Sequence, residues 1–211
     1  MTTSDPLDDW LSSQPAKVHL RPKLLMEAIR EAYPIGVPAF IVKSQTDRLG
    51  ASGQYAFHLG TPDDVLRRIC SWLLTHGEEG VLSQIVGRLW KRHGREDVAL
   101  AALLLANLQS DVDVWTQLAN VIEGASTAEA LLLSIEECFR AKHDPPEDEQ
   151  LVEWCSIGTV HAHLALLTCH ANWIRSGRPD LPSKLKSALK MIPYPDGDSL
   201  LSRVRDQMLE S

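Results

Sequence analysis

The strongest folding signal in this chain lies in YAFHLGTPDDVLRRICSWLL at residues 55–74 and IVGRLWKRHGREDVALAALLLANL at residues 85–108. In both stretches, apolar residues recur at the three- and four-residue spacing that gathers them on one face of an α-helix. We interpret them as three consecutive amphipathic helices joined by short turns. Helices joined in this way pack antiparallel, and each pair leaves an apolar face for the next pair to cover.

Local signals place the ends of several helices. The sequence TPDD at residues 61–64 predicts a helix start, with Thr61 as N-cap and Pro62 at the first helical position. Residues 98–108 are apolar nearly all round, which predicts a central, buried helix. The sequence STAE at residues 126–129 matches a capping box, in which Ser126 caps a helix and Glu129 bonds back to its backbone N–H.

The helix density along the chain indicates the fold class. We expect roughly nine or ten helices between residues 21 and 209, which is typical of stacked two-helix repeats of the HEAT or armadillo kind. The prediction is an all-α protein, an α-solenoid of antiparallel helix pairs, with a single repeat domain at residues 21–211. Residues 1–20 mix Ser, Asp, Pro and Gln, and are expected to form a flexible N-terminal arm from which Trp10 and Leu11 dock on the domain.

Composition narrows the choice of partner and compartment. The net charge is −7, so the field of the whole chain does not attract phosphate, and nucleic-acid contact requires a local basic face. The four cysteines show no CxxC spacing and lie in apolar helical surroundings, which favours free thiols in a reducing compartment. Because neither a signal peptide nor a membrane-spanning apolar run is found, we expect a cytoplasmic protein with no membrane partner.

Three motifs occur in order between residues 57 and 105: FHLGTPDDVLRRI at residues 57–69, then Leu89 and Trp90, then EDVALAALLL at residues 96–105. This order resembles the first repeats of the DNA alkylation repair family of HEAT-like DNA glycosylases, and the likeness covers about residues 55–140. The resemblance implies a curved, right-handed solenoid. It also implies a concave basic surface that grips duplex DNA and removes cationic N-alkylated bases by hydrolysis without flipping them.

Three residues are candidates for base removal. In active family members, the helix after the turn that corresponds to residues 124–127 carries a Trp pair and an Asp. Here that helix has no Trp, and Glu129 is the acid nearest to the Asp position. An oxocarbenium-like sugar needs a nearby carboxylate and an aromatic face, so the candidates are Glu129 as the acid and Trp115 or Trp154 as the aromatic wall. The alternative roles are structural, in the capping box for Glu129 and in the core for the tryptophans.

Basic residues concentrate near the ends of the helices in the two opening stretches. At the ends of successive repeats they could line one edge of the solenoid and contact DNA phosphates. The alternative is that they complement helix dipoles or are simply solvated. The candidate phosphate contacts are Arg67, Arg68, Arg88, Lys91, Arg92 and Arg95.

Taken together, these features favour a DNA-binding member of the family with weak or no N-glycosylase activity on bases such as 3-methyladenine and 7-methylguanine. The alternative is a non-enzymatic scaffold whose groove binds a protein or peptide, which the net acidity and the missing Trp and Asp favour. No cofactor motif is found. A metal site is not expected, because His163 and His170 share one helical face but no third ligand converges with them.

Overall fold

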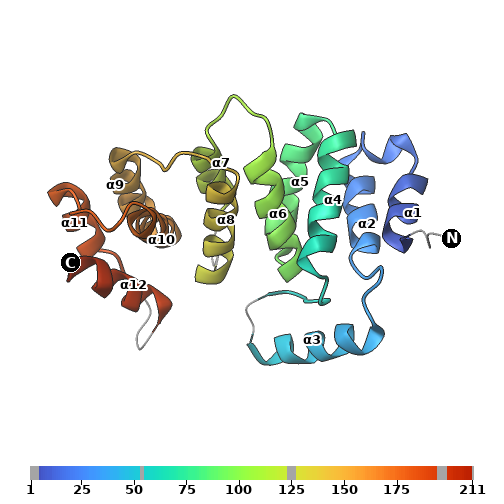
Figure 1. Ribbon diagram of the computed structural model, residues 1–211, viewed down its shortest axis with the longest axis horizontal. Helices are drawn as coiled ribbons and strands as arrows, with labels where there is room; N and C mark the ends of the chain where they lie inside the picture. The colour runs from blue at the N-terminus through green and yellow to red at the C-terminus, as the bar shows by residue number, and fades with distance from the viewer. Residues whose placement is uncertain (1–4, 53–54, 123–126, 194–198, 211) are drawn as a thin grey trace. The chain divides into compact units, whose positions relative to one another are not determined.

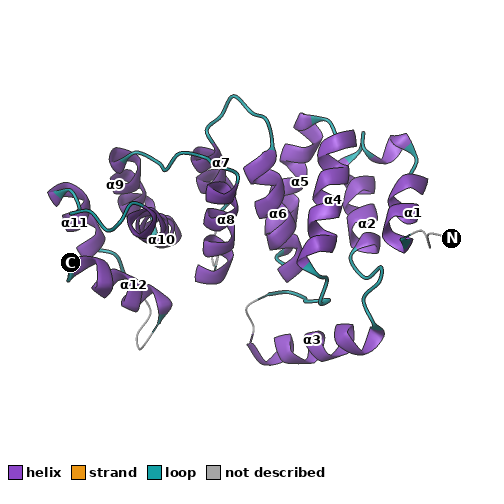
Figure 2. Ribbon diagram, in the orientation of Figure 1, coloured by secondary structure: helices purple, strands orange, loops and turns teal. Residues whose placement is uncertain are grey.

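The computed structural model describes residues 5–52, 55–122, 127–193 and 199–210. These residues form α-helices and one short 3₁₀ helix, with no strand among them (Figure 2), so the predicted all-α class is confirmed. The first six helices are α1 (Pro6–Ser13), α2 (Pro22–Ala32), α3 (Ala39–Ser52), α4 (Asp63–His76), α5 (Glu79–Arg92) and α6 (Arg95–Asn107). The last six are α7 (Val114–Val121), α8 (Ala128–Arg140), α9 (Asp148–Ile157), α10 (Thr159–Arg175), α11 (Ser183–Lys190) and α12 (Leu200–Leu209).

The chain divides into two compact units, residues 1–111 and residues 112–211. Unit 1 contains α1 to α6, and unit 2 contains α7 to α12. The sequence predicts a single boundary, at residue 20, and one domain beyond it. The division between the two units falls in the loop between α6 and α7.

Part of the expected N-terminal arm is an ordered helix. Asp5 caps α1 by accepting a hydrogen bond from the backbone N–H of Leu7 at 2.8 Å. Leu7 and Leu11 are buried, and α1 packs against α2. The docking predicted for Leu11 is therefore confirmed, whereas Trp10 is only half-buried.

Helix α6 is the core of unit 1. Every residue from Glu96 to Ala106 is buried, which confirms the prediction of a central, buried helix. Both α4 and α5 pack against α6, and α2 packs against α5, so these four helices lie side by side (Figure 1). Two-residue links join α4 to α5 and α5 to α6, as the short turns in the sequence indicated.

Two of the predicted helix caps are wrong in detail. Helix α4 begins at Asp63 with Pro62 as N-cap, because the Thr61 hydroxyl is buried and donates a hydrogen bond to the Tyr33 carbonyl at 3.0 Å. Helix α8 is capped by Thr127, whose hydroxyl accepts from the Ala130 N–H. The Ser126 of the proposed capping box lies outside the described residues.

Unit 2 is organised around α10. This helix packs against α8, α9 and α12, and α11 packs against α9 and α12. The interior of α10 is almost entirely apolar, since Leu164, Ala165, Leu166 and Leu167 are all fully buried. Such a helix excludes water from the centre of the unit and supplies most of its apolar contact surface.

Gly94, between α5 and α6, gives a test of packing in unit 1. A β-carbon on Gly94 would overlap the ring of Phe57, whereas one on Gly87, inside α5, would meet nothing within 4 Å. Gly94→Ala should therefore destabilise the protein by about 1–3 kcal/mol through overpacking. Gly87→Ala, the matched control, should stabilise it by about 0.5–1 kcal/mol because alanine favours a helix interior. Urea denaturation measures both changes, and equal effects of the two substitutions would contradict this packing.

Candidate anion-binding pocket

The segment at residues 55–61 is held by backbone hydrogen bonds against the junction of α5 and α6. The Ala56 N–H donates to the His93 carbonyl at 2.8 Å, and the Arg95 N–H donates to the Phe57 carbonyl at 2.9 Å. His93 ends α5 in the left-handed conformation, with φ of 56°, which turns the chain at this point. These bonds place Phe57 beside the first turn of α6.

The carboxylate of Glu96 anchors the end of the same segment. Its Oε1 atom accepts hydrogen bonds from the backbone N–H groups of Leu59 and Gly60, both at 2.9 Å, and of Thr61 at 3.3 Å. Gly60 has a φ of 78°, a conformation that glycine adopts without strain and that turns successive N–H groups towards one anion. The Nε2 atom of His58 lies 3.8 Å from the same oxygen. The fully buried Glu96 thus fixes residues 58–61.

The neighbouring carboxylate, Asp97, binds side chains from two other helices. Arg92 of α5 donates to both of its oxygens, and the Tyr33 hydroxyl, just after α2, donates to Oδ1 at 3.0 Å. Burial raises the pKa of Tyr33 well above its ordinary value, and the charge of Asp97 raises it further, so the hydroxyl keeps its proton. Burial opposes the charged form of Arg92, but the hydrogen bonds and charge of Asp97 outweigh burial and raise its pKa.

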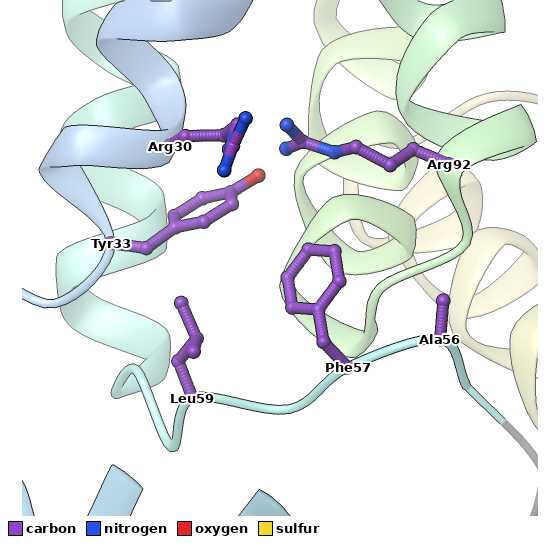
Figure 3. A pocket seen from close by; sticks show the side chains of 6 residues that line it. All are labelled: Arg30, Tyr33, Ala56, Phe57, Leu59 and Arg92. Carbon is purple, nitrogen blue, oxygen red and sulfur yellow. The ribbon is translucent and has the colours of Figure 1, made fainter.

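A pocket of about 420 Å³ lies beside this network. Its lining consists of Arg30, Tyr33, Ala56, Phe57, Leu59 and Arg92. Figure 3 shows the guanidinium groups of Arg30 and Arg92 facing each other across one side, with the Phe57 ring and Leu59 on the other. Arg92 also lies over the Phe57 ring, 5.5 Å from its centroid.

The two arginines of this pocket differ in their partners. Asp97 neutralises Arg92, but Arg30 is exposed and makes no ion pair with any carboxylate of the described residues. Glu96 is turned to the backbone of residues 59–61 rather than to Arg30. The arrangement therefore offers one guanidinium without a carboxylate partner among the described residues, that of Arg30, beside an apolar wall.

Three of the six predicted phosphate contacts are already paired within unit 1. Arg67 binds Asp63 one turn earlier in α4, at 2.9 Å. Arg68 binds Asp5 at 2.9 Å and Asp8 at 2.6 Å, and these hydrogen bonds raise its pKa above its ordinary value. Arg92 is held by Asp97 in the pocket.

The other three predicted contacts, Arg88, Lys91 and Arg95, make no ion pair with the described residues. Arg88 and Lys91 are exposed on the last two turns of α5, and Arg95 is half-buried at the start of α6. We call these three residues the junction cations.

The candidate catalytic residues lie in unit 2, where the two tryptophans are buried and offer no exposed aromatic face. Trp115 is only 1% exposed and donates a hydrogen bond from Nε1 to the Asp144 carbonyl at 2.6 Å, and Trp154 is 3% exposed. Both indoles therefore pack in the core of the unit, with little surface left for a ligand. Glu129 is an exposed side chain in the first turn of α8.

The two histidines that share a face of α10 bond to other parts of unit 2, and the cysteines of the chain are not paired. His163 bonds through Nε2 to the Pro193 carbonyl, and His170 to the Gln207 side chain. No group of three or more potential ligands that could hold a metal ion is found in the part of the chain that the structure describes. All four cysteines are free thiols, as predicted, and burial raises the pKa of Cys138 and Cys169 to about 12.

Two residues of the pocket, Arg30 and Tyr33, carry no functional signal in the sequence. Arg30 stands in the last turn of α2, where a cation is expected from the helix dipole alone. Tyr33 follows that helix directly and belongs to no motif. Both residues lie near Arg92 because α2 packs against α5. That packing is a long-range contact, which no local sequence pattern predicts.

Comparisons with protein-family models, curated proteins and solved structures find no match for this chain. Every helix of the described residues is also too short or too polar to cross a lipid bilayer. The chain is an all-α protein with two arginines lining a pocket in its N-terminal unit.

The buried ion pair of Arg92 and Asp97 gives a second test. Arg92→Gln leaves the fully buried Asp97 without its cation, and removing one partner of a buried pair costs about 3–5 kcal/mol. The control is Arg67→Gln, which removes an exposed pair and should cost less than about 1 kcal/mol. The free energy of unfolding in urea measures both. A similar, small loss in the two variants would show that the Asp97 network does not hold unit 1 together.

Proposed function

We propose that this chain is a DNA-binding, HEAT-like repeat protein, a right-handed solenoid of antiparallel helix pairs, in which the junction cations contact duplex DNA phosphates. The short links between α4, α5 and α6 and the packing of both α4 and α5 on α6 support the repeat architecture. The family resemblance of residues 55–140 supports DNA as the partner.

The observation that carries the proposal is the distribution of charge at the α5–α6 junction. Arg88 and Lys91 are exposed three residues apart, so they share one face of α5, and Arg95 follows at the next helix start. The two acids that follow in sequence, Glu96 and Asp97, are fully buried and already bound. The side chains that reach solvent at this junction are therefore cations, which is what phosphate contact requires.

DNA affinity should depend on the junction cations. A triple variant, Arg88→Gln, Lys91→Gln and Arg95→Gln, should bind a labelled duplex at least about tenfold more weakly at low salt. The slope of log K against log salt should fall by about one for each cation that no longer meets a phosphate. The measurement is fluorescence anisotropy between about 50 and 200 mM salt. The matched control replaces Lys184, Lys186 and Lys190 of α11 by Gln, which removes the same charge from unit 2.

Two results would contradict the proposal. One is the absence of duplex binding by the native chain at low salt, which would turn attention to a protein or peptide partner. The other is an equal loss of affinity in the α11 control, which would show that only overall charge matters.

Base removal is expected to be weak or absent, because Glu129 is a surface side chain and both candidate tryptophans are buried. Release of 7-methylguanine and 3-methyladenine from methylated duplex DNA should stay within about tenfold of the protein-free rate, since the usual carboxylate and aromatic face are missing. Chromatography of the released bases measures this. Rapid release that Glu129→Gln abolishes would contradict the expectation and make Glu129 the catalytic acid.

A further inference from the structure

The pocket between α2 and the α5–α6 junction combines two arginines, one of them without a carboxylate partner among the described residues, with an apolar wall. The DNA contact described above does not use it. We infer that this pocket binds a small organic anion, a carboxylate or phosphate group attached to an apolar body. The proposal stands independently of DNA binding, because none of the junction cations lines the pocket.

The anionic group is indicated by the two facing guanidinium groups. Asp97 already neutralises Arg92, whereas Arg30 has no carboxylate partner among the described residues, so an anion bound between the two guanidinium groups would give Arg30 a counter-charge. Arg92 is fixed by its two hydrogen bonds to Asp97, so its free N–H donors are already oriented. Arg30 approaches from α2 with no carboxylate partner among the described residues (Figure 3). A planar carboxylate or a phosphate accepts paired N–H donors from such groups.

The apolar body is indicated by the remaining lining. Ala56, Phe57 and Leu59 present only carbon atoms from their side chains, and the bonds of residues 56–61 to α5 and α6 hold them in place. The volume of about 420 Å³ far exceeds that of an inorganic anion and falls in the usual range for small-molecule sites. A bare phosphate or carbonate would leave this wall facing water.

Isothermal titration of the full chain with four probes tests the inference: phenyl phosphate, benzoate, inorganic phosphate and benzyl alcohol. At least one aromatic anion should bind more tightly than either inorganic phosphate or benzyl alcohol, because only the aromatic anions combine charge with an apolar ring. The tighter of the two identifies the pocket as a phosphate-ester or a carboxylate site.

The variant is Arg30→Gln, chosen because Arg30 is exposed and its loss strands no buried partner. Affinity for the aromatic anion should fall at least about tenfold, the loss expected for one charge-assisted, paired contact. The control is Lys23→Gln, which removes the same charge from an exposed position of the same helix and should change affinity less than about twofold.

Three outcomes would overturn the inference. They are no binding of either aromatic anion at millimolar concentration, unchanged affinity in Arg30→Gln, and binding of benzyl alcohol or inorganic phosphate equal to that of the aromatic anions. Failure here leaves the junction cations and their salt dependence unaffected. Conversely, a failure of the native chain to bind DNA would not affect the pocket inference, because the two proposals rest on different residues.

Discussion

The structure of unit 1 depends on the burial of two adjacent carboxylates, Glu96 and Asp97, at the start of its most apolar helix. A buried anion is tolerated only where hydrogen bonds or opposite charges replace water. Glu96 obtains three N–H groups from residues 59–61, and Asp97 obtains Arg92 and the Tyr33 hydroxyl. Because these partners belong to the loop before α4, to α5 and to the end of α2, satisfying two charges fixes three segments around α6.

The same constraint builds the pocket. Arg92 and Tyr33 line the pocket because Asp97 holds them there, and Phe57 lines it because its carbonyl receives the N–H of Arg95. Gly94 leaves room for the Phe57 ring at the helix start, where any side chain would collide with it. Apart from Arg30, the lining is therefore organised by internal bonds, and such preorganisation lowers the entropy that binding a ligand must overcome.

Local patterns were sufficient for the helices of residues 55–108, but they missed α1 in the expected flexible arm and were insufficient for these contacts. The apolar run of residues 98–108 identified the buried helix, and capping chemistry placed the start of α4 to within one residue. The acids Glu96 and Asp97, however, look in sequence like surface charges that complement a helix dipole. Glu96 depends on donors such as the Gly60 N–H, 36 residues away, and Asp97 depends on the Tyr33 hydroxyl, 64 residues away, as well as on Arg92, five residues away. Such partners are chosen by tertiary packing, which periodicity does not record.

Counting cations in the sequence overstates the basic face, because a guanidinium bound to a carboxylate adds no net charge for a ligand. Arg67 and Arg68 are paired with Asp63, Asp5 and Asp8. The junction cations differ because the acids beside them in sequence are directed inwards, towards α2, α5 and residues 59–61. Which charged side chains reach solvent in this part of unit 1 thus depends on the burial of Glu96 and Asp97. In a chain of net charge −7, that burial of Glu96 and Asp97 leaves Arg88, Lys91 and Arg95 as charged side chains that reach solvent around the start of α6.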